Sequence, residues 1–194
     1  MKPIKLLVIL LVISTLNVSC VPRTNLKPIP NQSEPQNFMG LFEIMPPQGD
    51  NWFEGQRAAG FLSYGKYLDS RKHTFATSVH VSKIDEKFND EKEFLTFIKT
   101  LRAADSNPIK FRNMSHEEVL DTKHGKFCTR YNLEGEEIGK GILEMIGYTC
   151  LHPKHPTLVV TISYSERTAG VKGNRVGKNI RSEGEGFINS LKFN

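Results

Sequence analysis

The sequence predicts a single α+β domain in which two helices flank an antiparallel sheet. Two observations predict this class. Strand-like segments follow one another with short connections, and one helical segment lies between them while a second lies at the C-terminal end. Strands joined by short connections pair antiparallel, because parallel strands need long crossovers. Residues 38–194 are expected to form this domain.

Strands are predicted where larger apolar side chains alternate with small polar ones or form short apolar runs. The clearest alternation covers residues 74–84 and is typical of a half-buried strand. Residues 157–165 form the strongest strand signal in the second half of the chain. The remaining strands are expected at residues 41–45, 58–68, 119–120, 126–133 and 142–151.

Two amphipathic helices are predicted from apolar residues at helical spacing. The first covers residues 90–104, with Asn89 or Asp90 as its N-cap and acidic residues in its first turn. The second begins near residue 179 and contains Gly184 and Gly186, which weaken it by up to about 1 kcal/mol each relative to alanine.

The spacing of Cys128 and Cys150 predicts a disulfide. If the glycine-rich loop 135–141 joins two antiparallel strands, the midpoint between the two cysteines is position 139, next to the centre of that loop. The cysteines then face each other across the hairpin at a distance suitable for a disulfide. The alternative is a reactive cysteine paired with a histidine such as His152, but no Cys-x-x-Cys motif accompanies it.

The first twenty residues read MKPIKLLVILLVISTLNVSC, which is typical of a signal peptide covering residues 1–19. The segment from Leu16 to Cys20 resembles a bacterial lipobox, in which the cysteine is lipidated and becomes the new N-terminus. Ser19 fits that pattern, whereas Asn17 stands where leucine is usual. Cys20 is therefore the expected site of lipidation and palmitate attachment. Secretion without a lipid is the alternative.

Residues 20–37 are expected to form a flexible tether between the lipidated cysteine and the domain. Residues 21–37 contain four prolines and few large apolar side chains, a composition that favours extended, solvated backbone. The sequence therefore predicts that the folded part of the chain begins near Phe38.

A basic, glycine-interleaved stretch near the C-terminus is the candidate anion-binding site. Such a loop before a helix can bind phosphates or anionic headgroups, although a solvated loop has the same composition. Its cationic residues are Arg167, Lys172, Arg175, Lys178 and Arg181.

No metal or other cofactor is expected, and no catalytic residue is assigned. His152 and His155 are three residues apart, but the flanking prolines make a turn more plausible than a metal-binding helix. The sequence contains no G-x-S-x-G, Walker or G-x-G-x-x-G motif. Nucleic acid is not expected as a partner, because the basic stretch contains no aromatic residue.

The order of elements and the ending Gly186-Phe187-Ile188-Asn189-Ser190-Leu191-Lys192-Phe193 resemble the Mog1/PsbP-like family. The resemblance covers residues 38–194. It implies an antiparallel sheet flanked by helices and a role in binding or assembly. It carries no catalytic residue over to this chain.

These observations predict a lipid-anchored protein of the bacterial cell envelope that faces the periplasm. Val21 after the modified cysteine favours the outer membrane over the inner membrane. We expect an adaptor or assembly factor that binds an envelope protein or a membrane component, not an enzyme. One alternative is an exported hydrolase whose pocket contains a carboxylate and two or more of His80, His116, His152 and His155. The other is a small-ligand carrier with a large apolar cavity between the sheet and the helices.

Overall fold

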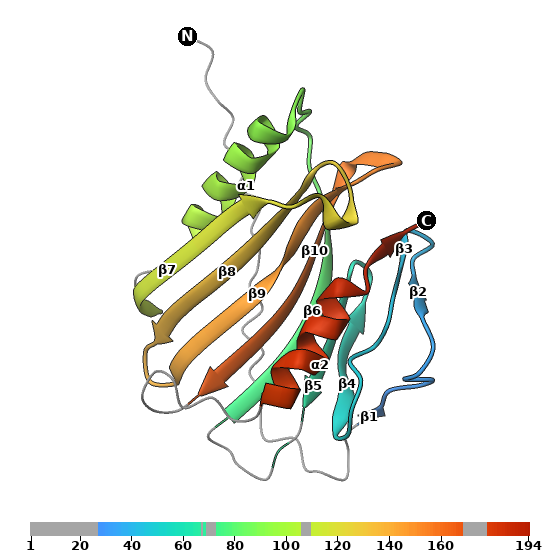
Figure 1. Cartoon of the computed structure of the whole chain (residues 1–194), viewed down its shortest axis with the longest axis vertical. Helices are drawn as coiled ribbons and strands as arrows, with labels where there is room; N and C mark the ends of the chain where they lie inside the picture. Colours follow the sequence, from blue (N-terminus) through green and yellow to red (C-terminus); the bar gives the residue numbers. More distant parts are fainter. Residues whose placement is uncertain (1–26, 67, 69–72, 106–109, 169–177) are drawn as a thin grey trace.

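An eight-stranded antiparallel sheet dominates the computed structural model, which describes residues 27–66, 68, 73–105, 110–168 and 178–194 (Figure 1). Its strands lie in the order β1 (Lys27–Pro28), β4 (Trp52–Ala58), β5 (Phe61–Lys66), β6 (His73–Lys83), β10 (His155–Thr168), β9 (Gly141–His152), β8 (Cys128–Glu137) and β7 (Phe111–Leu120). A small second sheet has the order β11 (Lys192–Phe193), β3 (Phe42–Ile44) and β2 (Gln36–Phe38).

The predicted α+β class is wrong, because the described part of the chain is mostly β. Strands account for 54% of it and helices for 18%. The two α-helices are α1 (Glu91–Asp105) and α2 (Lys178–Asn189), and a short 3-10 helix covers Thr122–His124. Neither α-helix has the length and apolar composition of a membrane-spanning helix. The antiparallel sheet was predicted correctly, but only two α-helices accompany its eight strands in the described part of the chain, so the fold is β-rich rather than α+β.

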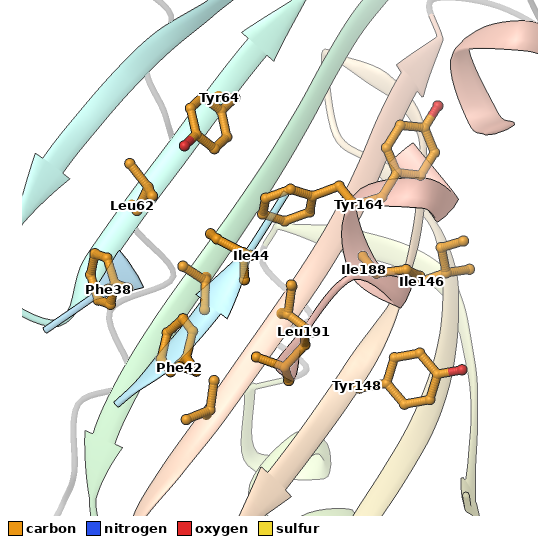
Figure 2. Close-up of a cluster of buried hydrophobic side chains, with 14 of the residues drawn as sticks. Phe38, Phe42, Ile44, Leu62, Tyr64, Ile146, Tyr148, Tyr164, Ile188 and Leu191 are labelled. Atoms are coloured by element: carbon orange, nitrogen blue, oxygen red, sulfur yellow. The ribbon is translucent and has the colours of Figure 1, made fainter. Parts of the chain in front are cut away.

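The main core lies between the large sheet, α2 and the small sheet (Figure 2). Strand β10 presents Val160, Ile162 and Tyr164 to this side, and all three are at most 1% exposed. Helix α2 buries Phe187 and Ile188 against them. The small sheet closes the core with Phe42 and other apolar residues, among them Phe38 and Ile44.

Helix α1 packs on the opposite face of the large sheet. Its Phe94 and Ile98 form a second apolar cluster with Val159. Because Val159 and Val160 are consecutive strand residues, they point to opposite faces, so α1 and α2 lie on opposite sides of the sheet. The predicted cap is present: Asp90 Oδ1 accepts a hydrogen bond of 2.9 Å from the Glu93 N–H.

The Cys128–Cys150 disulfide is confirmed. The two residues are directly opposed in the β8–β9 ladder, with their Cα atoms 4.1 Å apart. The register from Cys128↔Cys150 to Glu137↔Gly141 centres the hairpin on position 139. The connection itself is only residues 138–140, because most of the glycine-rich segment predicted as a loop continues the two strands.

Residues 27–37 are ordered against the domain, although the sequence placed them in the tether. Lys27 and Pro28 pair with β4, and Ile29 is only 9% exposed and joins the main core. Gln36 belongs to β2. Among the described residues, the folded part therefore begins at Lys27 rather than at Phe38. The leader and Cys20 lie outside the described residues.

Candidate functional site

A cleft of about 260 Å³ lies at the edge of the large sheet formed by β1 and β4, where the chain crosses to the small sheet. Charged, amide-bearing and proline residues line it. We call it the edge cleft, and its lining consists of Lys27, Pro30, Asn31, Glu34, Pro35, Gln36, Glu54 and Arg57.

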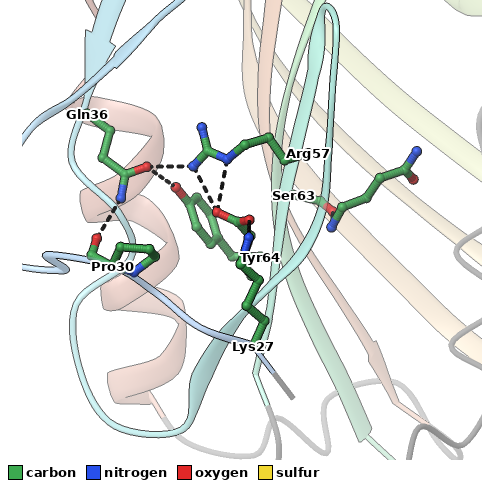
Figure 3. Close-up of polar contacts among 8 residues, drawn as sticks. Lys27, Pro30, Gln36, Arg57, Ser63 and Tyr64 are labelled. Atoms are coloured by element: carbon green, nitrogen blue, oxygen red, sulfur yellow. Dashed lines mark hydrogen bonds and ion pairs between the residues drawn. The ribbon is translucent and has the colours of Figure 1, made fainter. Parts of the chain in front are cut away.

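A buried carboxylate organises the cationic wall of the edge cleft (Figure 3). The side chain of Glu54 is only 3% exposed. Its Oε1 accepts a hydrogen bond of 2.8 Å from Lys27 Nζ, and its Oε2 accepts from Arg57 Nε at 3.0 Å and Nη2 at 2.8 Å. Burial alone would raise the pKa of Glu54, but hydrogen bonds and charge from Arg57 and Lys27 lower it below its ordinary value.

A β-bulge makes this arrangement possible. Residues three apart in a regular strand point to opposite faces, so Glu54 and Arg57 would normally diverge. The ladder shifts between them, because Glu54 pairs with Tyr64 whereas Arg57 pairs with Leu62. The extra residue turns both side chains to the same face. Ser63 Oγ accepts the Gln56 N–H in the bulge at 3.0 Å.

Gln36, the first residue of β2, fastens the segment that links β1 to β2 to this wall (Figure 3). Its Oε1 accepts hydrogen bonds from Arg57 Nη2 at 2.9 Å and from the Tyr64 hydroxyl at 3.0 Å. Its Nε2 donates to the Pro30 carbonyl at 3.0 Å. Burial raises the pKa of Tyr64 to about 12, so the phenol keeps its proton and remains a donor.

Several polar groups of the edge cleft are exposed and can still form hydrogen bonds or ion pairs with a ligand. The side chains of Lys27 and Arg57 are 65% and 40% exposed. Within the described part of the chain, Arg57 Nη1 has no hydrogen-bond partner, and the exposed Glu34 carboxylate has none either. The cleft can therefore contact charged groups of both signs.

Two of the five cationic residues predicted to bind an anion, Arg167 and Arg181, have described side chains, and these two lie apart. Arg167 follows Glu166 on β10, and Glu166 pairs with Glu144, which binds Arg181 of α2 at 3.2 Å. Neighbouring strand residues point to opposite faces, so Arg167 and Arg181 lie on opposite sides of the sheet. Each also has an acidic partner, Glu137 for Arg167 and both Glu144 and Glu185 for Arg181.

The other three members of that predicted set cannot be placed in this way. Lys172 and Arg175 lie outside the described residues. Lys178 begins α2, but its side chain is outside the described part. The anion site predicted from these five residues therefore stays a prediction.

The histidines considered for metal binding or catalysis are dispersed or structurally engaged. His152 is 1% exposed; its Nδ1 accepts the N–H groups of Lys154 and His155, and its Nε2 donates to the Leu41 carbonyl at 3.0 Å. Both ring nitrogens are thus used to close the β9–β10 turn and hold β3. No group of three or more metal-ligating side chains occurs among the described residues.

Two other histidines that were considered, His80 and His116, lie on different strands. His80 of β6 packs against the Phe61 ring, and its Nδ1 lies 3.2 Å from Ser82 Oγ. Burial lowers the pKa of His80 below its ordinary value. His116 is exposed on β7, which is the far edge strand of the sheet.

A second polar cluster lies between α1 and the large sheet. Arg102 Nε donates to Glu118 Oε2 at 3.0 Å, and its Nη2 donates to Thr149 Oγ1 at 2.9 Å. The guanidinium lies 3.8 Å above the Tyr131 ring centroid. Glu118 and Tyr131 are 3% and 2% exposed, so these groups fasten α1 to the sheet rather than face solvent.

No protein-family model matches the sequence, and no curated protein matches it. The resemblance of residues 38–194 to the Mog1/PsbP-like family therefore stays a prediction. The edge cleft and the disulfide are the features of this chain that bear most directly on its function.

Proposed function

We propose that this chain is a lipid-anchored protein of the bacterial cell envelope that faces the periplasm and acts by binding. The membrane is its first partner, through the lipid on Cys20, and an envelope protein or a small ligand is its second. The observation that carries the proposal is the disulfide between Cys128 and Cys150.

The disulfide supports export because such bonds persist in oxidising compartments and are rare in the bacterial cytosol. Both cysteines are fully buried in the main core, so the bond is a structural part of the β8–β9 hairpin. A buried, directly opposed pair is typical of a stabilising crosslink rather than of a reactive thiol.

The N-terminal sequence supports a membrane anchor on the same side of the membrane. Lys2 and Lys5 followed by an aliphatic run and Cys20 are typical of an exported lipoprotein. Several acyl chains on one cysteine would hold the domain firmly, because a single chain binds only marginally.

The docking of Lys27 on β4 supports a position close to the membrane. The Cα atoms of Cys20 and Lys27 are separated by at most about 25 Å even in a fully extended chain. The anchor would therefore place the β1 edge of the sheet, and with it the edge cleft, near the membrane surface.

The edge cleft supports a binding role. Glu54 holds Lys27 and Arg57 in place before any ligand arrives, and Gln36 braces Arg57 from the other side. Preorganised polar groups bind with less loss of conformational entropy than mobile ones.

The anchor is tested by labelling cells that express the full chain with radioactive palmitate and fractionating their membranes. We expect the wild-type protein to be labelled and membrane-bound, and Cys20→Ser to lose both properties. The double variant Cys128→Ser, Cys150→Ser is the matched control and should keep its label. Unchanged labelling and fractionation of Cys20→Ser would contradict the proposal.

A further inference from the structure

We infer that the edge cleft binds a small zwitterion, a free amino acid or a dipeptide. Its carboxylate lies against Lys27 and Arg57, and its ammonium lies against Glu34. This inference names the ligand class for the binding role proposed above and rests on that role, although its chemistry is independent of the lipid anchor.

The cationic wall has an unsatisfied positive charge. Glu54 compensates one of the two charges on Lys27 and Arg57, which leaves a net charge of +1 on this wall. Lys27 Nζ donates one hydrogen bond to Glu54 and has two further N–H groups, while Arg57 Nη1 has no partner within the described residues. These free donors can bind a carboxylate through charge-assisted hydrogen bonds.

The lining of the cleft also carries one exposed carboxylate, that of Glu34. Glu34 lies in a turn whose backbone closes with a 2.9 Å hydrogen bond from the Glu34 N–H to the Asn31 carbonyl. Asn31 has a φ of 47°, a left-handed conformation that asparagine adopts more easily than most residues. No described residue contacts the Glu34 carboxylate through a hydrogen bond or ion pair. It would repel a simple anion and attract an ammonium group.

The volume of the cleft limits the size of the ligand. Its 260 Å³ is below the roughly 300–1,000 Å³ of sites that hold drug-sized molecules. A single amino acid or a dipeptide fits this volume, whereas a longer peptide would project into solvent.

The edge of β4 offers contacts for a peptide group. Among the described residues, β1 pairs with Phe53 and Glu54 alone, while β4 continues to Ala58 with exposed residues from Gly55 onward. The backbone of that continuing edge can hydrogen-bond a short extended ligand, as sheet edges do with bound peptides. This contact favours the dipeptide over the free amino acid.

Calorimetric titration of the full chain in detergent tests the ligand class. The probes are L-alanine, L-alanyl-L-alanine, its N-acetyl form, its C-terminal amide and inorganic phosphate. We expect the unblocked dipeptide to bind at least about tenfold more tightly than either blocked form or phosphate, since each blocked form loses one charge contact. Tighter binding of alanine than of dipeptide would assign the site to free amino acids.

Charge variants locate the site. Glu34→Gln should weaken dipeptide binding about tenfold and leave binding of the N-acetyl form unchanged. Lys27→Gln should weaken binding of both these ligands and leave binding of the amide unchanged. Glu117→Gln and Lys83→Gln, at exposed positions on β7 and β6, are the matched controls and should bind like the wild type.

Three results would overturn the inference. The first is no saturable binding of alanine or the dipeptide, and the second is equal binding of the blocked and unblocked forms. The third is an affinity for phosphate that is not higher in Glu34→Gln than in the wild type. Palmitate labelling of the same variants separates the two proposals. Intact labelling without dipeptide binding refutes the ligand class alone, whereas dipeptide binding without labelling refutes the anchor alone.

Discussion

Glu54 is the side chain through which the β1–β4 edge is held together. It accepts three hydrogen bonds from Lys27 and Arg57 while nearly buried. We predict that Glu54→Gln lowers the free energy of unfolding by about 1–2 kcal/mol, because the amide carries no charge and keeps one acceptor oxygen, so its NH2 group faces a cationic donor. Urea denaturation measures this loss. Lys27→Gln, which removes an exposed partner, should cost less than about 1 kcal/mol, and an equal loss in both variants would contradict this role for Glu54.

His124 makes the fold sensitive to mild acid. Burial lowers its pKa below the usual 6.5, although its hydrogen bond to the Leu191 carbonyl partly opposes this shift. The unfolded chain therefore takes up a proton at a higher pH than the folded chain. Stability is complete above about pH 6.5 and falls as the pH drops towards the pKa of the folded state.

We predict that the urea midpoint of the wild type decreases between about pH 7.5 and pH 5.5. His124→Gln should reduce this decrease, because the substituted residue does not titrate. His116→Gln, at an exposed position on β7, is the control and should retain the wild-type pH dependence. If the urea midpoint of His124→Gln depends on pH as strongly as that of the wild type, other titrating groups cause the loss of stability in acid.

Helix α2 contains two glycines, Gly184 and Gly186, that have the same helix propensity but different surroundings in the structure. A Cβ at Gly184 would collide with the Tyr164 ring, whereas a Cβ at Gly186 would meet no atom within 4 Å. We predict that Gly186→Ala stabilises the protein by up to about 1 kcal/mol through helix propensity. Gly184→Ala should destabilise it by about 1–3 kcal/mol through overpacking. Thermal unfolding of both variants measures the difference, and stabilisation by both would contradict the close packing at Gly184.

The β8–β9 hairpin depends on its crosslink. Cys128 and Cys150 are 22 positions apart, and closing such a loop stabilises a protein by about 3 kcal/mol in the chain-entropy model. We predict this loss of unfolding free energy in the Cys128→Ala, Cys150→Ala variant. Reduced wild-type protein should unfold at nearly the same urea concentration as the variant. Equal stability of the oxidised wild type and the variant would show that the bond contributes nothing.

Helices and strands whose apolar residues recur at a regular spacing were predicted well from the sequence. Residues 74–84 alternate cleanly and form β6 almost throughout, and residues 90–104 form α1 within one residue at each end. Strand β4 was missed because its exposed half contains Gly55, Gln56 and Arg57, which break the alternation around the bulge. Strand β7 was predicted only at its last two residues, because polar side chains dominate this edge strand.

The prediction of an α+β fold class was wrong for a related reason. Glycine-rich and proline-rich segments were predicted as broad loops, but the connections cover only residues 138–140 and 153–154. The strands are correspondingly longer than predicted, so the structure is mostly β. Tight turns between long strands leave few residues for a local composition signal to detect.

The edge cleft could not be predicted from the sequence. It depends on long-range contacts, in which Gln36 meets Arg57 and Tyr64, and Lys27 meets Glu54. The four prolines between residues 21 and 37 indicate extended backbone, but they do not reveal that Ile29 enters the core. The disulfide was predictable because strand register is a matter of counting positions from the turn.

For the molecule as a whole, we propose an exported, lipid-anchored domain with a structural disulfide. This proposal can be tested by intact-mass spectrometry of non-reduced protein purified from membranes of its native host. We predict a chain that begins at an acylated Cys20, with Cys128 and Cys150 joined and inaccessible to alkylation. A chain that retains Met1 and has both of these cysteines as free thiols would refute the proposal.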